Sequence, residues 1–257
     1  VQCDELRIKI QGAITWMGMA IMVPTRLWLG GEVSQQRDRA LIENLITRVK
    51  GCASALGGAI LFCTDGLGSY PTVIKDVFRE KTPRDETGRC RLIEWPNILI
   101  ARVIKGYEHN RVVGMTREIY QGTKEAVADV IKLTQGKGDI NTAFIERLNG
   151  TFRGCLNSLA RRTRSLSRRS KTLQSGMYLV GSVYNFCVEH ESLRLPGLIG
   201  GHKWLERTPA MASGITDHCW AIDELLLFKV PPPRWKPTLK RGRPTKALKA
   251  TIARWCQ

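Results

Sequence analysis

Three kinds of pattern are missing from the sequence, and each absence excludes a class of protein. The eight cysteines form no C-x-x-C pair, which argues against a zinc site built from ligand pairs. Their wide spacing, mostly among apolar residues, instead predicts reduced thiols in the core of a cytoplasmic protein. No signal peptide and no apolar run of membrane-spanning length occurs, so we expect no association with a membrane.

Acidic residues are scarce as well. The 257 residues include 40 Lys and Arg but only 23 Asp and Glu, which gives a formal net charge of +17. A positive excess of this size indicates a polyanionic partner, and nucleic acid is the commonest one. Ribosomal proteins and membrane-surface proteins share this balance, so the charge alone does not identify the partner.

The pattern of apolar residues predicts an α/β fold with a mixed sheet flanked by helices. Apolar alternation and short connections indicate an antiparallel meander of three strands, over residues 1–10, 16–23 and 26–33. An amphipathic helix is expected over 38–49, and a wholly apolar, buried strand over 59–64 ends at Asp65. A short helix over 69–79 comes next. This order of elements is the opening order of a ribonuclease H-like domain.

The stretch 141–153, which reads NTAFIERLNGTFR, predicts the start of a helix. Asn141 and Thr142 can both cap it, because short polar side chains accept hydrogen bonds from the first free N–H groups. One apolar face is formed at helical spacing by Leu148, Phe152, Leu156 and Leu159. A second face is formed by Glu146, Asn149 and Arg153. A carboxylate, an amide and a guanidinium in a row could bind a metal ion and the phosphate on which it acts.

A block of basic residues follows the same stretch. We expect the helix to run on through 161–169, which reads RRTRSLSRR. Eight basic residues and no acidic one occur from residue 147 to residue 171, namely Arg147, Arg153, Arg161, Arg162, Arg164, Arg168, Arg169 and Lys171. An unneutralised block of like charge repels itself, which favours a bound polyanion over an ordinary solvated face. We therefore expect these residues, together with Asn149, to contact DNA.

The chain changes character near residue 191, which divides it into two expected domains. Residues 1–190 hold the predicted sheet and its helices, and residues 191–257 form a basic extension that contains Pro and Gly. Pro231–Pro233 predicts a stiff, extended linker. The segment 240–244 is similar to an AT-hook, because its pair Arg241 and Arg243 around a Gly fits the narrow minor groove of A·T-rich DNA. A disordered basic tail is the alternative.

Three acidic side chains are candidates for metal ligands. Asp4 lies in the first strand, Asp65 ends the buried strand and Glu146 lies on the helix. A ribonuclease H-like sheet would place the two strands side by side under the helix, so the three carboxylates would converge. Such oxygen ligands suit Mg²⁺ or Mn²⁺, and two ions could drive a phosphodiester displacement. Glu5 is expected to point to the face opposite Asp4.

Several segments resemble the catalytic region of bacterial insertion-sequence transposases of the DDE class. The matching segments are VQCDE around Asp4, CTDGLGSYP around Asp65 and NTAFIERLNGTFR around Glu146, with Arg153 seven residues after the Glu. The runs RRTRSLSR, YNFCVEH and RTPAMASGITDHCW are similar to elements of such proteins as well. The resemblance covers most of the chain.

The resemblance implies an activity, a cofactor and partners. It implies a ribonuclease H-like fold with two divalent ions, Mg²⁺ or Mn²⁺, that nicks transposon ends and transfers the free 3′ hydroxyl into target DNA. Asp4, Asp65 and Glu146 would be the catalytic residues and metal ligands, and Arg153 would contact phosphate near the metals. The partners would be double-stranded DNA and further copies of the chain, at the nucleoid in the bacterial cytoplasm.

Two alternatives stay open. Transposases of this class carry an N-terminal DNA-recognition domain, whereas three residues precede Asp4 and the chain begins without Met. We therefore expect that an N-terminal region is missing, and a truncated, inactive derivative that binds DNA is the first alternative. The second is another ribonuclease H-like nuclease, such as a junction resolvase, against which the length and the basic tail argue.

Overall fold

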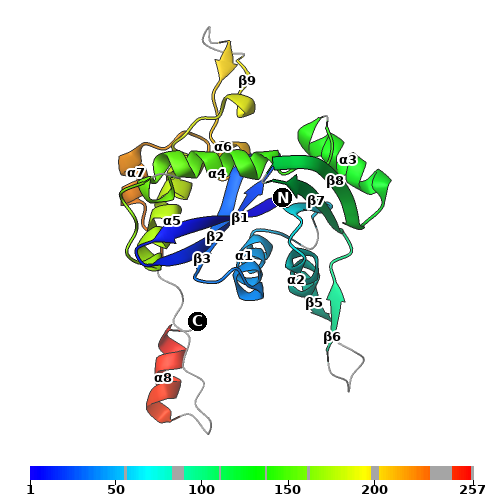
Figure 1. Cartoon of the computed structure of the whole chain (residues 1–257). Coiled ribbons are helices and arrows are strands. Elements are labelled where there is room, and N and C mark those ends of the chain that lie inside the picture. The colour runs from blue at the N-terminus through cyan, green and yellow to red at the C-terminus, as the bar shows by residue number, and fades with distance from the viewer. Residues whose placement is uncertain are drawn as a thin grey trace. The chain divides into compact units, whose positions relative to one another are not determined.

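The structure is a computed structural model (Figure 1), and the residues that it describes are 1–54, 57–82, 90–109, 111–136, 138–160, 163–197, 203–231 and 245–255. The chain forms two compact units, Val1–Ile222 and Asp223–Gln257. The first unit therefore extends past the expected division at residue 190, and that division stays a prediction about functional domains.

Strands and helices are interleaved along the chain, with most of the strands before residue 122 and most of the helices after it. The strands are β1 Gln2–Ile10, β2 Ala13–Met22, β3 Leu27–Ser34, β4 Ile60–Asp65, β5 Arg79–Thr82, β6 Arg91–Glu94, β7 Ile98–Glu108, β8 Arg111–Gln121, β9 Leu195–Pro196 and β10 Trp204–Leu205. The helices are α1 Arg39–Gly51, α2 Ser69–Val77, α3 Lys124–Gln135, α4 Ala143–Cys155, α5 Ser170–Phe186, α6 Pro209–Ala212, α7 Ile222–Leu227 and α8 Lys246–Trp255. Single 3₁₀ turns span Asn157–Leu159 and Glu191–Leu193.

The centre of the first unit is a six-stranded mixed sheet with the order β3-β2-β1-β4-β7-β8. The meander β1-β2-β3 is antiparallel, β4 is parallel to both β1 and β7, and β8 returns antiparallel to β7. The predicted α/β class and ribonuclease H-like mixed sheet are confirmed. The small hairpins β5-β6 and β9-β10 are separate from this sheet.

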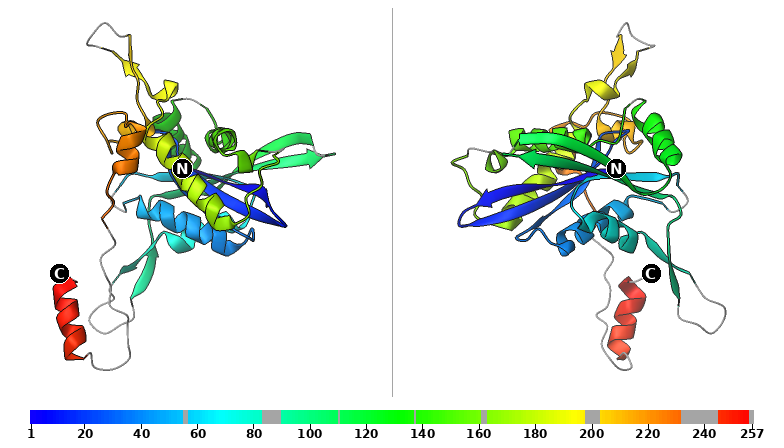
Figure 2. Two further views of the ribbon diagram at one scale, coloured as in Figure 1. Left: turned by 90° about the vertical axis from the view of Figure 1, so that its left-hand side faces the viewer. Right: turned by 45° about the vertical axis from the view of Figure 1, so that its right-hand side comes forward.

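Helices cover both faces of the sheet (Figures 1 and 2), because successive strand residues point to opposite sides. On one face α1 and α2 pack over a core that includes Cys3, Phe62 and Ile100. On the other face α4 and α5 pack over Leu6 and Ile8. Helix α3 covers β4 and β7 on this second face, over buried side chains such as Leu61, Leu99 and Val103. Two apolar layers thus hold the strands between them.

Helix α1 shows how local sequence sets an element. Asp38 caps it, because its carboxylate accepts a hydrogen bond of 3.0 Å from the amide of Leu41. The predicted apolar stripe is buried, and its members are Leu41, Ile42, Leu45, Ile46 and Val49. The strand that follows, β4, is buried along its length as expected of a central parallel strand.

The expected extension of the key helix through 161–169 is wrong for the residues described there. Helix α4 ends at Cys155, and residues 163–169 are not helical. Gly154, Asn157 and Ser158 at this point disfavour helix and favour turns. The predicted apolar face is nevertheless buried, since Leu148, Phe152 and Leu159 lie in one core with Leu156 packed against it.

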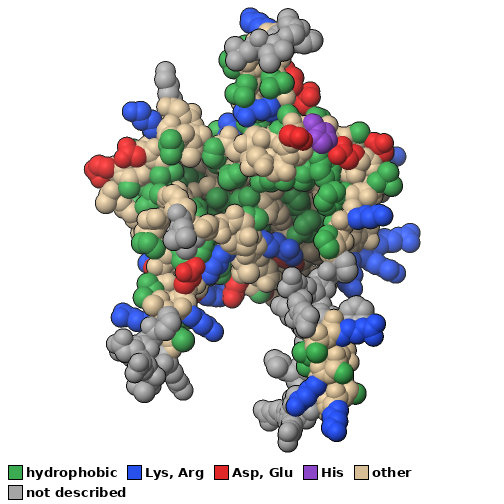
Figure 3. All heavy atoms as spheres, turned by 180° about the vertical axis from the view of Figure 1, so that it is seen from behind, with side chains coloured by type: hydrophobic (Ala, Val, Ile, Leu, Met, Phe, Trp, Pro, Cys, Tyr) green, Lys and Arg blue, Asp and Glu red, His purple; other side chains and the backbone are tan. Residues whose placement is uncertain are grey.

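The second unit consists of the end of α7, the residues that follow it and α8. The basic side chains Lys246, Lys249 and Arg254 project from α8, and Figure 3 shows Lys and Arg side chains along it. Within the described part of the chain, no helix is both long and apolar enough to cross a membrane. The expectation of core thiols holds for Cys3 and Cys63 and is wrong for the exposed Cys52, Cys90 and Cys155.

Candidate functional site

The register between β1 and β4 brings two acidic residues together. These parallel strands pair through Gln2 and Cys63, so the residues two positions further along each strand, Asp4 and Asp65, lie at neighbouring positions. Past this point β1 and β4 separate, and a cleft of about 860 Å³ opens between them. Asp4, Glu5, Asp65 and Glu146 all line it, together with three basic residues, Arg37, Lys105 and Arg153.

Gln2 ties helix α4 to strand β1. Its side-chain oxygen accepts hydrogen bonds of 3.0 Å from the amides of Phe144 and Ile145, and its Nε2 donates to the Asn141 carbonyl at 2.8 Å. Gln2 is fully buried, and it caps the helix in place of a residue from the helix itself. The expectation that Thr142 caps α4 is wrong, because its side chain makes no capping bond, whereas Asn141 accepts from the amide of Ala143.

A second link joins the same two elements one helical turn later. The Asn149 Nδ2 group donates a hydrogen bond of 2.7 Å to Oδ2 of Asp4. Asn149 is 2% exposed, so the expected polar face of Glu146, Asn149 and Arg153 lies against the cleft rather than in bulk solvent. The two links fix α4 to the first residues of β1.

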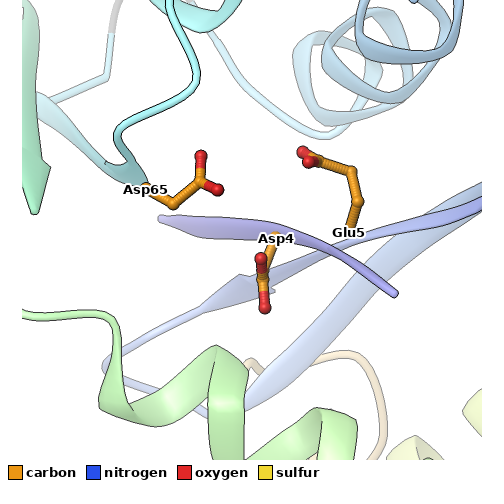
Figure 4. A group of neighbouring side chains, drawn as sticks. All are labelled: Asp4, Glu5 and Asp65. Carbon is orange, nitrogen blue, oxygen red and sulfur yellow. The ribbon is translucent and has the colours of Figure 1, made fainter. Parts of the chain in front are cut away.

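Three of the acidic residues form a tight group. Asp4, Glu5 and Asp65 each offer one oxygen, and these oxygens lie within 4.8 Å of one another. Figure 4 shows the Asp4 carboxylate on one side of β1 and the Glu5 carboxylate on the other, as the alternation of strand residues predicts. Glu146 does not belong to this group, although it lines the same cleft.

Glu5 is engaged by protein groups on its side of the sheet. Its Oε2 accepts two hydrogen bonds from the guanidinium of Arg37, at 3.0 and 2.8 Å, and its Oε1 accepts one from the Tyr70 hydroxyl. The same Arg37 guanidinium also donates to Oδ2 of Asp65 at 3.1 Å. Glu5 therefore holds the Arg37 guanidinium against the Asp65 carboxylate.

Glu146 stands at the opposite rim of the cleft. Its Oε1 accepts hydrogen bonds from the ammonium of Lys105 on β7 and from the Thr142 hydroxyl, the latter at 3.1 Å. Its side chain is 47% exposed, so it can change rotamer without disturbing the core. Lys105 lies two positions after Val103, the residue that pairs with Asp65 across the β4-β7 ladder.

The group of acids changes the protonation of Asp4. Burial raises the pKa of the Asp4 carboxyl to about 7, and the charges of Glu5, Asp65 and Glu146 add to the effect. Burial likewise raises the pKa of Glu5, against the hydrogen bonds from Tyr70 and Arg37. Asp4 therefore carries a proton over much of the acidic range, and a cation bound beside it would displace that proton.

The donor atoms fit Mg²⁺ or Mn²⁺. Carboxylate oxygens are the hard ligands that these ions prefer, and Asp4 and Asp65 supply them from adjacent strands. Oδ1 of Asn149 is buried and accepts no hydrogen bond from any described residue, so an acceptor beside Asp4 is left for a metal-bound water. Arg37 and Lys105 would have to release their carboxylates to make room for a cation.

Asn149, predicted to contact DNA, is instead buried against Asp4, and the other predicted DNA-contacting residues divide into three sets. Arg153 lines the cleft, and Arg164, Arg168, Arg169 and Lys171 are exposed beyond it. Arg147 is exposed but does not line the cleft; its charge acts instead on Arg26, Tyr184 and His190. The remaining candidates lie outside the described residues, namely Arg161, Arg162, Arg241 and Arg243.

Three participants were missed by the sequence patterns: Gln2, Arg37 and Lys105. Gln2 lies two residues before Asp4, so the alternation of strand residues places both side chains on the same face of β1. The sequence alone could therefore have indicated that Gln2 lies near the site. Arg37 and Lys105 come from a loop and from a strand whose register no local pattern defines. No family model matches the sequence, and no curated protein matches it.

Proposed function

We propose that this chain is a DNA transposase of the DDE class that cleaves DNA strands and joins them to a target with the help of Mg²⁺ or Mn²⁺. The observation that supports this most is the cleft that Asp4 and Asp65, at neighbouring positions on parallel strands, share with Glu146 of helix α4. Carboxylates from two adjacent strands and one helix suit the binding of two ions.

Each residue of the cleft has a role in this proposal. Asp4 and Asp65 would hold the divalent ions, and Glu146 would turn from Lys105 to complete the ligand set. Such ions, when bound, activate the attacking water or 3′ hydroxyl and stabilise the leaving oxygen. Arg153 binds the phosphate next to the bond that breaks, and Asn149 orients Asp4.

The charge of the whole chain supports double-stranded DNA as the substrate. A formal charge of +17 attracts the phosphate backbone without regard to sequence. In this proposal the basic segment 240–244 adds contacts in the minor groove of A·T-rich DNA. Two transposon ends must be held together, so the active form is a homo-oligomer on DNA, at the bacterial nucleoid.

The test is the substitution Asp65→Asn, which keeps the size of the side chain but removes a metal ligand. Mg²⁺-dependent strand cleavage should fall by on the order of 10³-fold or more, while DNA affinity changes little, because phosphate contacts come from Arg and Lys. Asp129→Asn, on the exposed face of α3, is the matched control and should cleave normally. Unchanged cleavage by Asp65→Asn would remove the proposal.

One observation favours a second candidate, an inactive derivative that binds DNA. Glu146 lies outside the tight group of acids and is paired with Lys105, and Arg37 is bound to Asp65. If these ion pairs persist in the presence of Mg²⁺, the chain binds DNA without cutting it. A native chain that binds duplex DNA tightly, yet shows no cleavage with either ion, would establish this candidate.

A further inference from the structure

A second groove adjoins the acidic cleft. Its volume is about 610 Å³, and Arg153 belongs to the lining of both. One wall is formed by residues 7–9 of β1. The other wall is formed by the chain that follows α4, including Ser158, Leu159 and Arg164. A ligand in the acidic cleft could therefore continue past Arg153 into this groove.

The groove exists because one edge of β1 is left open. Strand β1 pairs with β2 along its whole length, but its pairing with β4 is confined to Gln2 and Cys63. Among the described residues, no strand occupies the other edge of β1 beyond that point. The chain after α4 runs alongside instead, fixed by burial of Leu159 and by a hydrogen bond of 2.9 Å from the Gln11 amide to the Ser167 carbonyl.

The groove and the cleft differ in charge, because among their described lining residues only the cleft has acidic ones, four of them beside Arg37, Lys105 and Arg153. The described charged residues of the groove are Arg7, Lys9, Arg153 and Arg164, all of them basic. The cleft next to it carries four carboxylates. Further basic side chains, Arg168 and Arg169, are exposed a few residues beyond Arg164 in the chain. The groove would bind a polyanion, one end of which would enter the acidic cleft, where bound metal ions would neutralise the carboxylates.

The lining also indicates which part of a nucleic acid is bound. Its uncharged members are small or aliphatic, such as Ile8, Ala160 and Leu166, and none of the described lining residues is aromatic. Bases of a single strand usually stack on aromatic rings, whereas phosphates need only cations. We propose that this groove binds the phosphate backbone of duplex DNA on one side of the bond that is cleaved, without regard to sequence. The statement that the bound DNA is cleaved in the adjoining acidic cleft rests on the proposed function.

The test is charge reversal on the strand wall, with Arg7→Glu and Lys9→Glu combined. Both side chains are exposed, so the core should remain intact, and Arg7→Gln with Lys9→Gln is the milder second variant. Lys124→Glu with Lys132→Glu, exposed on α3, changes the net charge equally and is the control. Affinity for a 30-base-pair duplex of arbitrary sequence is measured by fluorescence anisotropy in EDTA over a range of salt concentrations.

The groove variant should lose at least about tenfold in affinity at 0.15 M salt, and the slope of log affinity against log salt should shrink by about 2. The Gln variant should show the same slope change with a smaller loss, and the control should stay close to the native chain. Equal losses in the groove variant and the control would overturn the inference.

The result is separable from the fate of the proposed function. If the native chain does not cleave DNA, but the groove variant loses affinity and the control does not, the groove inference stands and the transposase proposal is overturned. If the native chain cleaves DNA with Mg²⁺, but the groove variant binds like the control, the proposed function stands and the groove inference is overturned.

Discussion

The acidic cleft and the basic segment 163–171 are both candidates for contact with DNA, and they are built in opposite ways. The cleft brings together residues from β1, β4, β7 and α4, and buried hydrogen bonds fix them. The basic segment is continuous in sequence, is not helical up to residue 169, and exposes its Arg and Lys side chains.

The difference fits the roles that we propose for the two regions. Catalysis on a phosphodiester requires ligands at fixed distances, so a small displacement of one element costs a large factor in rate. Attraction of a polyanion depends on the number of nearby cations, and each contributes nearly on its own. A single substitution in the cleft should therefore cause a large loss of cleavage rate, and two such substitutions should not be additive. Each substitution in the basic segment should cause a small loss of DNA affinity, and these losses should add.

The largest effect that would sharpen this comparison is expected for Gln2→Ala. It leaves the amides of Phe144 and Ile145 buried without their acceptor and releases α4 from β1. The free energy of unfolding should fall by about 3 kcal/mol. Cleavage should fall about 100-fold with DNA affinity unchanged, because Glu146 is displaced while the basic residues are not.

Gln11→Ala is the control for this prediction. Gln11 lies just after the same strand and is exposed, so its loss should change the free energy of unfolding by less than about 0.5 kcal/mol. Chemical denaturation measures the stability, and single-turnover cleavage measures the rate. Equal behaviour of the two variants would show that the link between β1 and α4 is dispensable.

An intermediate effect is expected from pH. The pKa of Asp4 is raised to about 7, so below that pH a proton must leave before a cation binds. Mn²⁺ affinity should fall by up to about tenfold for each pH unit below 7, as measured by titration calorimetry. Without metal, the stabilising contribution of neutral Asp4 is complete below its ordinary pKa of 3.8 and is lost as the pH rises through 7.

Two outcomes check the pH prediction. Asp4→Asn cannot carry the proton, so its free energy of unfolding should decline less between pH 4 and pH 7 than that of the native chain, and the raised pKa of Glu5 accounts for the decline that remains. Asp129→Asn should keep that decline, because this exposed residue is remote from the acids. Metal affinity of the native chain that stays constant from pH 5.5 to pH 7.5 would contradict the assignment of Asp4 as a ligand.

The smallest effect is expected in the basic segment. Arg168→Ala and Arg169→Ala each remove one exposed cation, so each should reduce the salt slope of DNA binding by about 1, and the double variant by about 2. Cleavage at saturating DNA should be unaffected. Strong non-additivity of the two substitutions would break the comparison, because it would mean that this segment also acts as a fixed unit.

The fold was predictable where a local pattern determined it. The stripe Leu41–Val49 and the apolar run that ends at Asp65 predicted α1 and β4, and the order of these elements predicted the mixed sheet. The end of α4 was not predicted, because the burial of Leu156 and Leu159 continues after the helix has stopped. Apolar spacing records which residues are buried and does not record whether the backbone between them is helical.

Of the three predicted acids, Asp4 and Asp65 come together as expected, whereas Glu146 lines the same cleft outside their group, and the partners of these acids were not predicted. Asp4, Asp65 and Glu146 line one cleft, and each stands at a recognisable place on its element. The contacts of Arg37 with Asp65 and of Lys105 with Glu146 depend on a loop conformation and on strand register. Register is set by the sheet as a whole, so the sequence around Lys105 does not indicate that it pairs with Glu146.

The bond between Gln2 and the start of α4 also has a consequence for synthesis on the ribosome. The side chain of Gln2 finds its partners only when residues 141–145 have left the exit tunnel. At about 5–20 residues per second, roughly 7 to 28 seconds pass between the synthesis of Gln2 and that of these residues, and until then the Gln2 amide can bond only to water. Glu146 follows directly behind these residues. Under the proposed function, a nascent chain whose first strand has already folded therefore has Asp4 in place but lacks Glu146, so it should not cut DNA.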